Sequence, residues 1–364
     1  MAAFAERFKH WYDWKWQYAH RIRRVDELDK YLSLSEKEKS DISQCLQSFR
    51  MAITPYYLSL INLSDPDDPI RMQAVPRIEE TRVCENDMED PLSEEACSPV
   101  PNLVHRYPDR VLLLVTYQCA MYCRHCTRRR AVGEEDRVIT EKNLQSALRY
   151  IREHEEIRDV LISGGDPLTL PTEKLEHIVA GIRAIPHVEV IRIGTRTPVV
   201  MPMRITTELL EMLKRYQPLW INTHFNHPAE ITPDSRQACE AIADAGIPLG
   251  NQSVLLRGVN DDVDIMKRLL LGLVRMRVRP YYLYQCDLSR GISHFRTSVD
   301  AGIDIMHALT GNISGFAVPR YVIDAPGGGG KIPVQYEYVL RKDDAEVVLE
   351  NFEGKTYTYP LARS

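Results

Sequence analysis

The sequence predicts an α/β protein built on a partial TIM-type (βα)6 barrel with a helical N-terminal extension. From residue 111 onwards, short β-rich segments alternate with longer segments of helical periodicity. The short segments are almost continuously apolar, as in a parallel sheet that helices cover on both faces. Polar residues end or follow most of them. A barrel would bring these residues to one mouth, whereas an open sheet would spread them along an edge.

Residues 1–100 are predicted to form the helical extension and a connector. Its tryptophans, Trp11, Trp14 and Trp16, are interpreted as packing anchors, and Ser35 is a predicted helix cap. Residues 84–101 are acidic and rich in Pro and Ser, which indicates a surface connector.

The barrel is predicted to occupy residues 101–315, and residues 316–364 a C-terminal segment. The predicted strands are Val111–Thr116, Asp159–Ser163, Val188–Ile193, Leu219–Phe225, Pro248–Leu255 and Tyr281–Tyr284. The helices between them are predicted near residues 141–155, 172–184, 206–216, 234–245 and 262–276.

The composition excludes several classes of protein. The chain is 44% hydrophobic and 27% charged, as in globular proteins, and its net charge of -5 argues against nucleic acid or an anionic membrane surface as the main partner. No apolar run approaches the roughly 18 residues of a membrane helix, and the N-terminus lacks the apolar core of a signal peptide. Eight cysteines, three of them in one loop, indicate a reducing cytoplasm rather than a disulfide scaffold.

The most informative segment contains Cys119, Cys123 and Cys126, followed by three arginines. Cys-x3-Cys-x2-Cys supplies three thiolates to an iron–sulfur cluster and leaves one iron open for another ligand. A zinc site needs a fourth ligand; His125 lies inside the loop, but no second Cys-x2-Cys occurs. A disulfide would leave an odd thiol. The spacing therefore favours a cluster.

A second motif, Asp324-Ala-Pro-Gly-Gly-Gly-Gly-Lys331, carries a lysine after four glycines. It is not a phosphate-binding loop of the Walker type, because Ala325 and Ile332 stand where that motif requires Gly and Ser or Thr. A lysine that a flexible loop directs into a barrel mouth is suited instead to forming a Schiff base.

Together these motifs resemble the lysine 2,3-aminomutase family of radical S-adenosylmethionine enzymes. The likeness extends over most of the chain, including Ile53-Thr-Pro-Tyr-Tyr, His105-Arg-Tyr-Pro-Asp-Arg-Val and Ser163-Gly-Gly-Asp-Pro-Leu. It implies a barrel of the radical S-adenosylmethionine kind and an isomerase that interconverts L-lysine and L-β-lysine by migration of the amino group. It also implies three cofactors: a 4Fe-4S cluster, S-adenosylmethionine, which the cluster cleaves to a 5′-deoxyadenosyl radical, and pyridoxal 5′-phosphate on Lys331.

The resemblance assigns the remaining cofactor contacts. Arg106 and Arg110 match the positions that bind the phosphate of pyridoxal phosphate. Without the lysine motif, they would be interpreted as solvated charges of a connecting segment. Asp166 alone would be an ordinary turn residue, and a half-buried His or Gln is more often simply hydrogen-bonded. The residues expected around S-adenosylmethionine are His125, Gly164, Gly165, Asp166, His224 and Gln252.

The substrate is also implied by the resemblance. Asp287 and Asp324 align with the carboxylates that hold the distal ammonium of lysine, and Arg128 with the arginine that holds its carboxylate. Two carboxylates at one end of the site and a guanidinium group at the other suit a basic α-amino acid. They argue strongly against glutamate, but they distinguish less well between one basic amino acid and another. Arg290 adds a further cation in the stretch expected to face the substrate.

Two alternatives remain open at this point: the same chemistry on L-arginine, another basic amino acid or a protein-bound lysine, or a non-catalytic iron–sulfur protein for electron transfer or redox sensing. The expected partners are a reduced flavodoxin or ferredoxin-like electron donor and further copies of the chain. The family's structural zinc site is expected to be missing, because Asp262 replaces its first cysteine and no cysteine follows Cys286.

Overall fold

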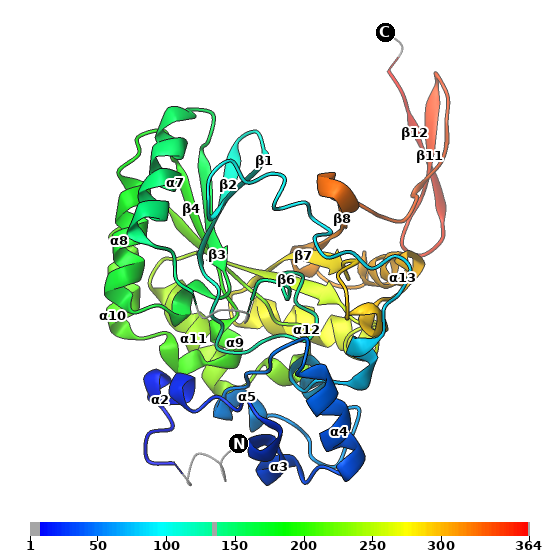
Figure 1. Cartoon of the computed structure of the whole chain (residues 1–364). Helices are drawn as coiled ribbons and strands as arrows, with labels where there is room; N and C mark the ends of the chain where they lie inside the picture. Colours follow the sequence, from blue (N-terminus) through cyan, green and yellow to red (C-terminus); the bar gives the residue numbers. More distant parts are fainter. Residues whose placement is uncertain (1–7, 133–136, 363–364) are drawn as a thin grey trace.

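The computed structural model describes residues 8–132 and 137–362, so the first residues of the N-terminal extension and the last two of the C-terminal segment lie outside it. At its centre is a nine-stranded sheet whose strands follow one another in chain order (Figure 1). The strands are β1 (Leu103–Tyr107), β2 (Arg110–Thr116), β3 (Asp159–Gly164), β4 (Val190–Gly194), β5 (Leu219–Thr223), β6 (Leu249–Leu255), β7 (Arg279–Gln285), β8 (Arg320–Ala325) and β9 (Gly330–Pro333). Strands β2 to β8 are parallel, and β1 and β9 pair antiparallel at the two edges.

Helices connect the parallel strands and cover the outside of the sheet (Figure 1). They are α7 (Glu141–Glu153), α8 (Thr172–Arg183), α9 (Thr197–Val200), α10 (Thr207–Lys214), α11 (Pro233–Asp244), α12 (Val263–Arg275) and α13 (Val299–Leu309). The predicted (βα)6 architecture is therefore confirmed. β8, β9 and α13 are not among the predicted elements, and the two strands extend the sheet beyond residue 315.

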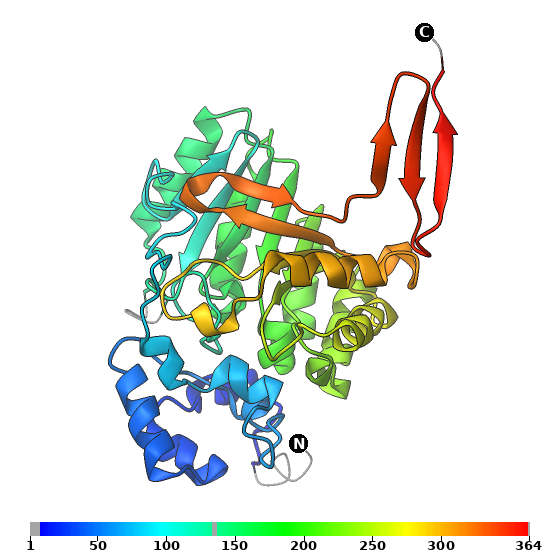
Figure 2. The same ribbon diagram turned by 90° about the vertical axis from the view of Figure 1, so that its right-hand side faces the viewer.

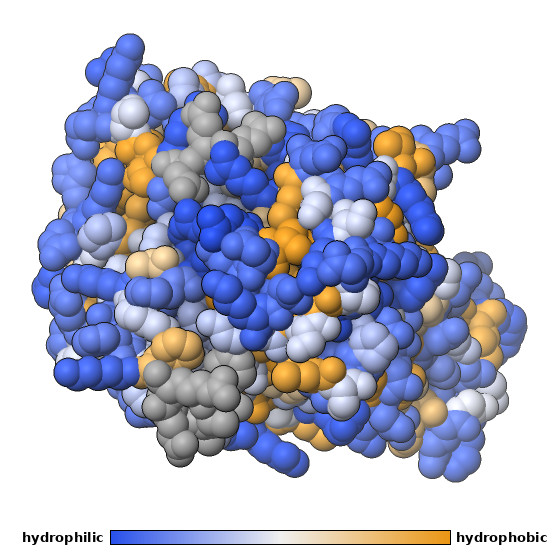
Figure 3. All heavy atoms as spheres, turned by 60° about the horizontal axis from the view of Figure 1, so that its bottom comes forward, coloured by the Kyte–Doolittle hydropathy of each residue, from blue (hydrophilic) through white to orange (hydrophobic). Residues whose placement is uncertain are grey.

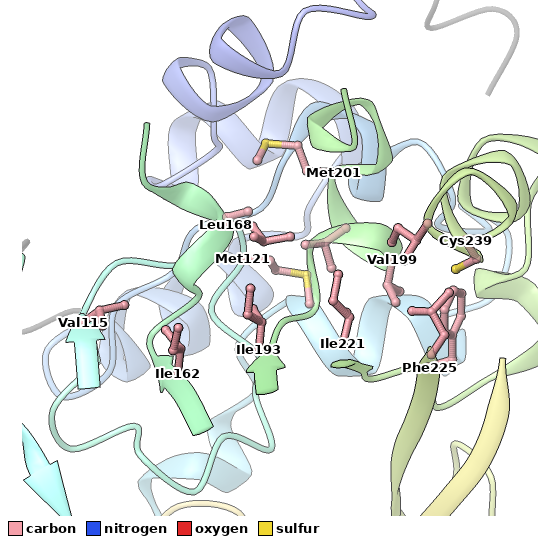
Figure 4. Packing of buried hydrophobic residues seen from close by; sticks show 14 of the residues in the cluster. Val115, Met121, Ile162, Leu168, Ile193, Val199, Met201, Ile221, Phe225 and Cys239 are labelled. Atoms are coloured by element: carbon pink, nitrogen blue, oxygen red, sulfur yellow. The ribbon is translucent and has the colours of Figure 1, made fainter. Parts of the chain in front are cut away.

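The core forms where side chains of successive strands meet. Val115, Ile162, Ile193 and Ile221, from β2 to β5, lie side by side and are buried (Figure 4). Each such side chain contributes roughly 1.5–3 kcal/mol by leaving water. Polar caps fix the surrounding helices; Asp262, for example, accepts from two backbone N–H groups at the start of α12.

The N-terminal extension folds into short helices that lie below the barrel in Figure 1. They are α2 (Trp14–Ala19), α3 (Val25–Leu32), α4 (Glu36–Cys45), α5 (Pro55–Leu58) and α6 (Pro69–Ala74). Trp11 is buried against Tyr56, as expected of a packing anchor, and Ser35 forms a capping box with Glu38. The face seen in Figure 3 is mainly hydrophilic, with hydrophobic residues in small separate groups.

A separate three-stranded antiparallel sheet follows the barrel: β10 (Val339–Lys342), β11 (Glu346–Glu350) and β12 (Thr356–Pro360). Figure 2 shows it standing away from the barrel. Its residues are exposed or half-buried. Of the helices in the described ranges, none is both long enough and apolar enough to span a membrane.

A buried ion cluster ties the extension to the cysteine loop. Glu80, in the short helix η1 (Ile78–Thr81), is buried and accepts from the guanidinium groups of Arg124 and Arg129. Arg124 also donates to the carbonyl of Arg50 at 2.8 Å. Since Arg124 lies between two of the cysteines, the extension fixes the backbone on which they stand.

We predict that Glu80→Ala lowers the free energy of unfolding by about 3–5 kcal/mol, because it leaves two buried guanidinium groups without their anion. Urea denaturation measures the change. Glu36→Ala is the control; Glu36 pairs with Lys39 at 3.0 Å, but its side chain is 92% exposed, and its loss is expected to change stability little. Similar values for the two variants would contradict the structural role of Glu80.

Candidate active site

A cavity of about 540 Å³ opens at the carboxyl ends of the parallel strands. Its volume lies within the usual range of small-molecule sites. Its lining includes every site residue predicted from the sequence: Arg106, Arg110, Cys119, Cys123, His125, Cys126, Arg128, Gly164, Gly165, Asp166, His224, Gln252, Asp287, Asp324 and Lys331. Arg290 does not line the cavity. It pairs with Glu89 at 2.9 Å and its side chain is about half exposed, so the expectation that this cation faces the substrate is wrong.

The three cysteines lie on a loop that the N-terminal extension supports from outside. The N–H of Tyr122 donates to Ala52 at 3.0 Å, and the N–H of Arg124 donates to Gln73 at 2.9 Å. Burial raises the pKa of the Cys126 thiol to about 11 and that of Cys119 well above its usual value. Without a positive partner these thiols stay protonated, and an iron–sulfur cluster would deprotonate them as ligands.

The three cysteines face one common space. In residues 8–132 and 137–362, no three Cys, His, Asp or Glu side chains are placed to hold one metal ion. Cys119, Cys123 and Cys126 nevertheless line the same cavity. Three thiol donors that face one cavity fit a cluster that takes three cysteine ligands and keeps one iron open.

Gly164 and Gly165, at the end of β3, let the cysteine loop approach the strand. The N–H of Gly165 donates to Thr116 at 2.6 Å, and that of Asp166 donates to Gln118 at 2.7 Å. A Cβ atom on Gly165 would lie 2.2 Å from the Gln118 carbonyl oxygen, and Gly164 has φ +136°, which favours glycine. The two glycines are thus required by the protein's own packing, besides the cofactor contact predicted for them.

Asp166 is buried and fully engaged with the protein. Its carboxylate accepts from the Thr195 hydroxyl at 2.6 Å, the Arg196 N–H at 2.8 Å and the Leu168 N–H at 3.0 Å. It caps the short helix η2 (Pro167–Thr169) and joins the ends of β3 and β4. Its role as a turn residue is therefore confirmed, and contact with S-adenosylmethionine stays a prediction.

His224 presents a neutral ring to the cavity. Its Nδ1 donates to the backbone carbonyl of Gln252 at 3.0 Å, so in the neutral ring Nε2 carries the lone pair. Burial lowers the pKa of His224 to about 4, which keeps it uncharged at neutral pH. The Gln252 side chain donates to the Tyr284 hydroxyl at 3.1 Å. Both predicted residues are thus hydrogen-bonded within the protein and still line the cavity.

Lys331 lies in β9, where the last strand faces the first. Its Nζ is 3.2 Å from Asp324 Oδ2 and 5.6 Å from the ring centroids of both Tyr107 and Tyr284. Its backbone N–H donates to the Tyr107 hydroxyl at 3.0 Å. Arg106 donates to the other oxygen of Asp324. Lys331 is partly exposed in the cavity, as an amine that must react with a carbonyl group requires.

The two predicted phosphate ligands flank the same tyrosine. The guanidinium carbons of Arg106 and Arg110 lie 5.0 Å and 3.9 Å from the Tyr107 ring centroid. Arg106 is largely buried, whereas Arg110 pairs with Asp109 at 2.7 Å and is about one third exposed. Two guanidinium groups beside Lys331 suit the phosphate of pyridoxal phosphate.

Each predicted substrate ligand already has a protein partner. The Nε and Nη2 atoms of Arg128 donate to both carboxylate oxygens of Glu94 at 2.8–3.0 Å. Asp287 accepts from the Thr127 hydroxyl. Glu94 belongs to the stretch predicted as a surface connector, yet it is buried and lines the cavity, so that interpretation is wrong for this residue.

Several residues of the site were not among the sequence-based candidates: Glu94, Tyr107, Thr127, Arg196 and Tyr284. The sequence could have indicated Thr127 and Arg196 as site residues, because Thr127 follows Cys126 directly and Arg196 follows a predicted strand. It gave no indication of Glu94, since the neighbourhood of Glu94 is acidic and rich in turn-forming residues.

Two family models match the chain. One, described as the Radical SAM superfamily, matches residues 113–269, and the other, described as Lysine-2,3-aminomutase, matches residues 306–363. Among curated proteins, the chain is 59% identical over 349 residues to the L-lysine 2,3-aminomutase of Acetoanaerobium sticklandii and 58% identical over 349 residues to that of Clostridium subterminale. Each alignment covers 96% of this chain and 84% of the relative. The glutamate 2,3-aminomutase of Clostridioides difficile is 49% identical over 345 residues, which cover 95% of this chain and 82% of that protein.

The charge state of Asp287 gives a pH prediction. Burial raises its pKa to about 6, so the neutral carboxyl is favoured below this value and the carboxylate forms as the pH rises through it. If Asp287 binds an ammonium group, the affinity for L-lysine will increase between about pH 5 and pH 7. Calorimetric titration measures the affinity. Asp287→Asn should bind more weakly and lose this rise, and a wild-type affinity that does not change over the interval would contradict the assignment.

Proposed function

The chain belongs to the lysine 2,3-aminomutase family of radical S-adenosylmethionine enzymes, and we propose that it interconverts L-lysine and L-β-lysine. The observation that carries the proposal is that Lys331 and the three cysteines line one cavity. A non-catalytic iron–sulfur protein has no use for a reactive lysine beside its cluster. Identity is also higher to the two lysine enzymes than to the glutamate enzyme, and Asp287 and Asp324, the carboxylates proposed for a distal ammonium group, line the cavity.

The residues of the chain divide the work of the reaction. When bound, the cluster and S-adenosylmethionine supply a carbon radical, and pyridoxal phosphate supplies a carbonyl that forms imines. Cys119, Cys123 and Cys126 would hold the cluster, and Lys331 would hold pyridoxal phosphate. The Nζ atom of Lys331 must lose a proton before it reacts, and Asp324 Oδ2, 3.2 Å away, is placed to accept that proton.

The substrate would be held at both ends by groups that exchange partners. Arg128 would bind the α-carboxylate, and Asp287 and Asp324 would bind the distal ammonium group. Asp324 is paired with Arg106 and Lys331, and Arg128 with Glu94, so binding replaces existing ion pairs. Such exchange avoids leaving a buried charge without a partner.

A product assay tests the proposal. Protein with a reconstituted cluster, S-adenosylmethionine and pyridoxal phosphate is incubated without oxygen with L-lysine or with L-arginine, and the β-isomers are separated by chromatography. We expect β-lysine from lysine and little product from arginine. Formation of the β-isomer from arginine alone would contradict the choice of substrate.

Two controls belong to this assay. Lys331→Ala should give no β-lysine and no pyridoxal trapped on the chain by borohydride; trapping that persists would place the anchor elsewhere. We also propose a reduced flavodoxin or ferredoxin as the natural electron donor. Either reduced carrier should replace dithionite in the assay. If dithionite supports activity and neither carrier does, these donors are wrong.

We further propose that the chain forms a homo-oligomer through the β10–β12 sheet. An isolated small sheet is marginally stable in water, and this one exposes Tyr357 to 54% and Tyr359 to 64%. A second copy that covered these side chains would supply the missing packing.

The wild-type protein is therefore expected to have the mass of an oligomer in light scattering after size exclusion. The double variant Tyr357→Glu, Tyr359→Glu should have the mass of a monomer, because it places charges in the apolar contact. Tyr12→Glu, at a tyrosine that is 69% exposed on the N-terminal extension, is the control and should leave the mass unchanged. A monomeric wild type would contradict the proposal.

A further inference from the structure

A buried arginine donates directly to one of the cluster cysteines. Arg196, just beyond β4, has Nη1 2.8 Å from the sulfur of Cys123. Its Nε donates to the His224 carbonyl at 3.1 Å, and its Nη2 donates to Glu230 at 2.7 Å and also to Gln73. These contacts leave the guanidinium little freedom to turn away from the sulfur atom.

Glu230 fixes this arginine from behind. It is completely buried, and its Oε1 accepts from Arg196 and, at 2.8 Å, from the Tyr57 hydroxyl. Its Oε2 accepts from the backbone N–H groups of Asn226 at 2.6 Å and His227 at 2.9 Å. Because both oxygens are engaged, Glu230 holds the positive charge of Arg196 next to Cys123.

A second donor in the same network has no hydrogen-bond partner among the residues that the structure describes. The Asn226 side chain accepts from the Val254 N–H at 2.9 Å through Oδ1, which fixes its orientation. Its Nδ2 therefore donates to His125 Nε2 at 3.2 Å. His125 Nε2 must be the acceptor, so the hydrogen of the neutral ring is on Nδ1.

This Nδ1–H group is left without an acceptor. His125 is 8% exposed, its Nδ1 is buried, and no hydrogen-bond partner of Nδ1 exists within the described part of the chain. A buried unpaired donor costs roughly 1–3 kcal/mol, which a bound acceptor would recover. His125 lies between Cys123 and Cys126 in the sequence and lines the same cavity, so sulfur atoms of a cluster are acceptors in its immediate surroundings.

We propose that Arg196 and His125 donate hydrogen bonds to sulfur atoms of the cluster site and thereby raise the reduction potential of the cluster. The inference rests on the proposed function, because it requires the cluster. Reduction adds negative charge, and hydrogen-bond donors and a nearby cation stabilise that charge. Both residues are positioning residues: they act on the cluster through its sulfur atoms and need not touch the substrate.

The test measures the potential of the cluster, in protein without pyridoxal phosphate or substrate. Reconstituted wild type, Arg196→Gln, Arg196→Lys and His125→Phe are titrated with redox mediators and followed by electron paramagnetic resonance. Arg196→Gln removes the cation, and His125→Phe keeps an aromatic ring against Phe295 but removes the donor. Both variants are expected to titrate at a more negative potential, by more than the scatter of repeated titrations, and Arg196→Lys is expected to lie between Arg196→Gln and the wild type.

Arg183→Gln is the matched control. Arg183 is a partly buried arginine of α8 that donates to backbone carbonyls, and it does not line the cavity, so its replacement should leave the potential unchanged. Wild-type potentials in Arg196→Gln and His125→Phe at full iron content would overturn the inference and leave the proposed function intact. If Arg196→Gln takes up no cluster, His125→Phe alone decides. A wild-type protein that takes up no cluster would overturn both.

Discussion

The site depends on one close approach between two backbones. Just after β3, the N–H groups of Gly165 and Asp166 donate to the carbonyls of Thr116 and Gln118 at 2.6 Å and 2.7 Å. Any side chain at position 165 would collide with the Gln118 carbonyl and prevent this approach. The extension holds the same loop from the other side through Arg124. The three cysteines are therefore positioned by the fold before any cluster binds, which is the arrangement that a rigid cofactor site needs.

The second half of the site lies at the seam of the barrel. β1 and β9 are the two edges of the nine-stranded sheet and are not hydrogen-bonded neighbours. Side chains join the two ends of the sheet instead: the Tyr107 hydroxyl in β1 accepts from the backbone of Lys331 in β9, and Arg106 in β1 pairs with Asp324 in β8. The proposed anchor of pyridoxal phosphate and one proposed substrate ligand are thus also the contacts that close the barrel. An incoming cofactor or substrate would find its binding groups at the place where the sheet can open without breaking strand pairing.

Local patterns determined how much the sequence predicted. The alternation of strands and helices, the cysteine spacing and the lysine motif are short-range features, and the three cysteines and Lys331 that they indicated line one cavity. The other candidates in the cavity were assigned through the family resemblance. Partners from distant segments were not predictable in this way. Glu94 is 34 residues from Arg128, and Glu230 is 34 residues from Arg196, so only the folded chain shows that each pair meets. The β10–β12 sheet was missed because it lies outside the alternation of strands and helices from which the barrel strands were predicted, and because β10 and β12 have no buried residue.

The internal ion pairs suggest an order of events. A cavity with unpaired buried charges would be unstable, and here Arg128 is satisfied by Glu94, and Asp324 by Arg106 and Lys331. Asp324 can receive a substrate ammonium group only after these cations have found other partners. If pyridoxal phosphate binds as proposed, Arg106 would pair with its phosphate, and Lys331 would be engaged by its carbonyl instead of pairing with Asp324. On the proposed assignments, the cofactor would thus free Asp324 for the ammonium group of the substrate, and cofactor binding would precede productive substrate binding.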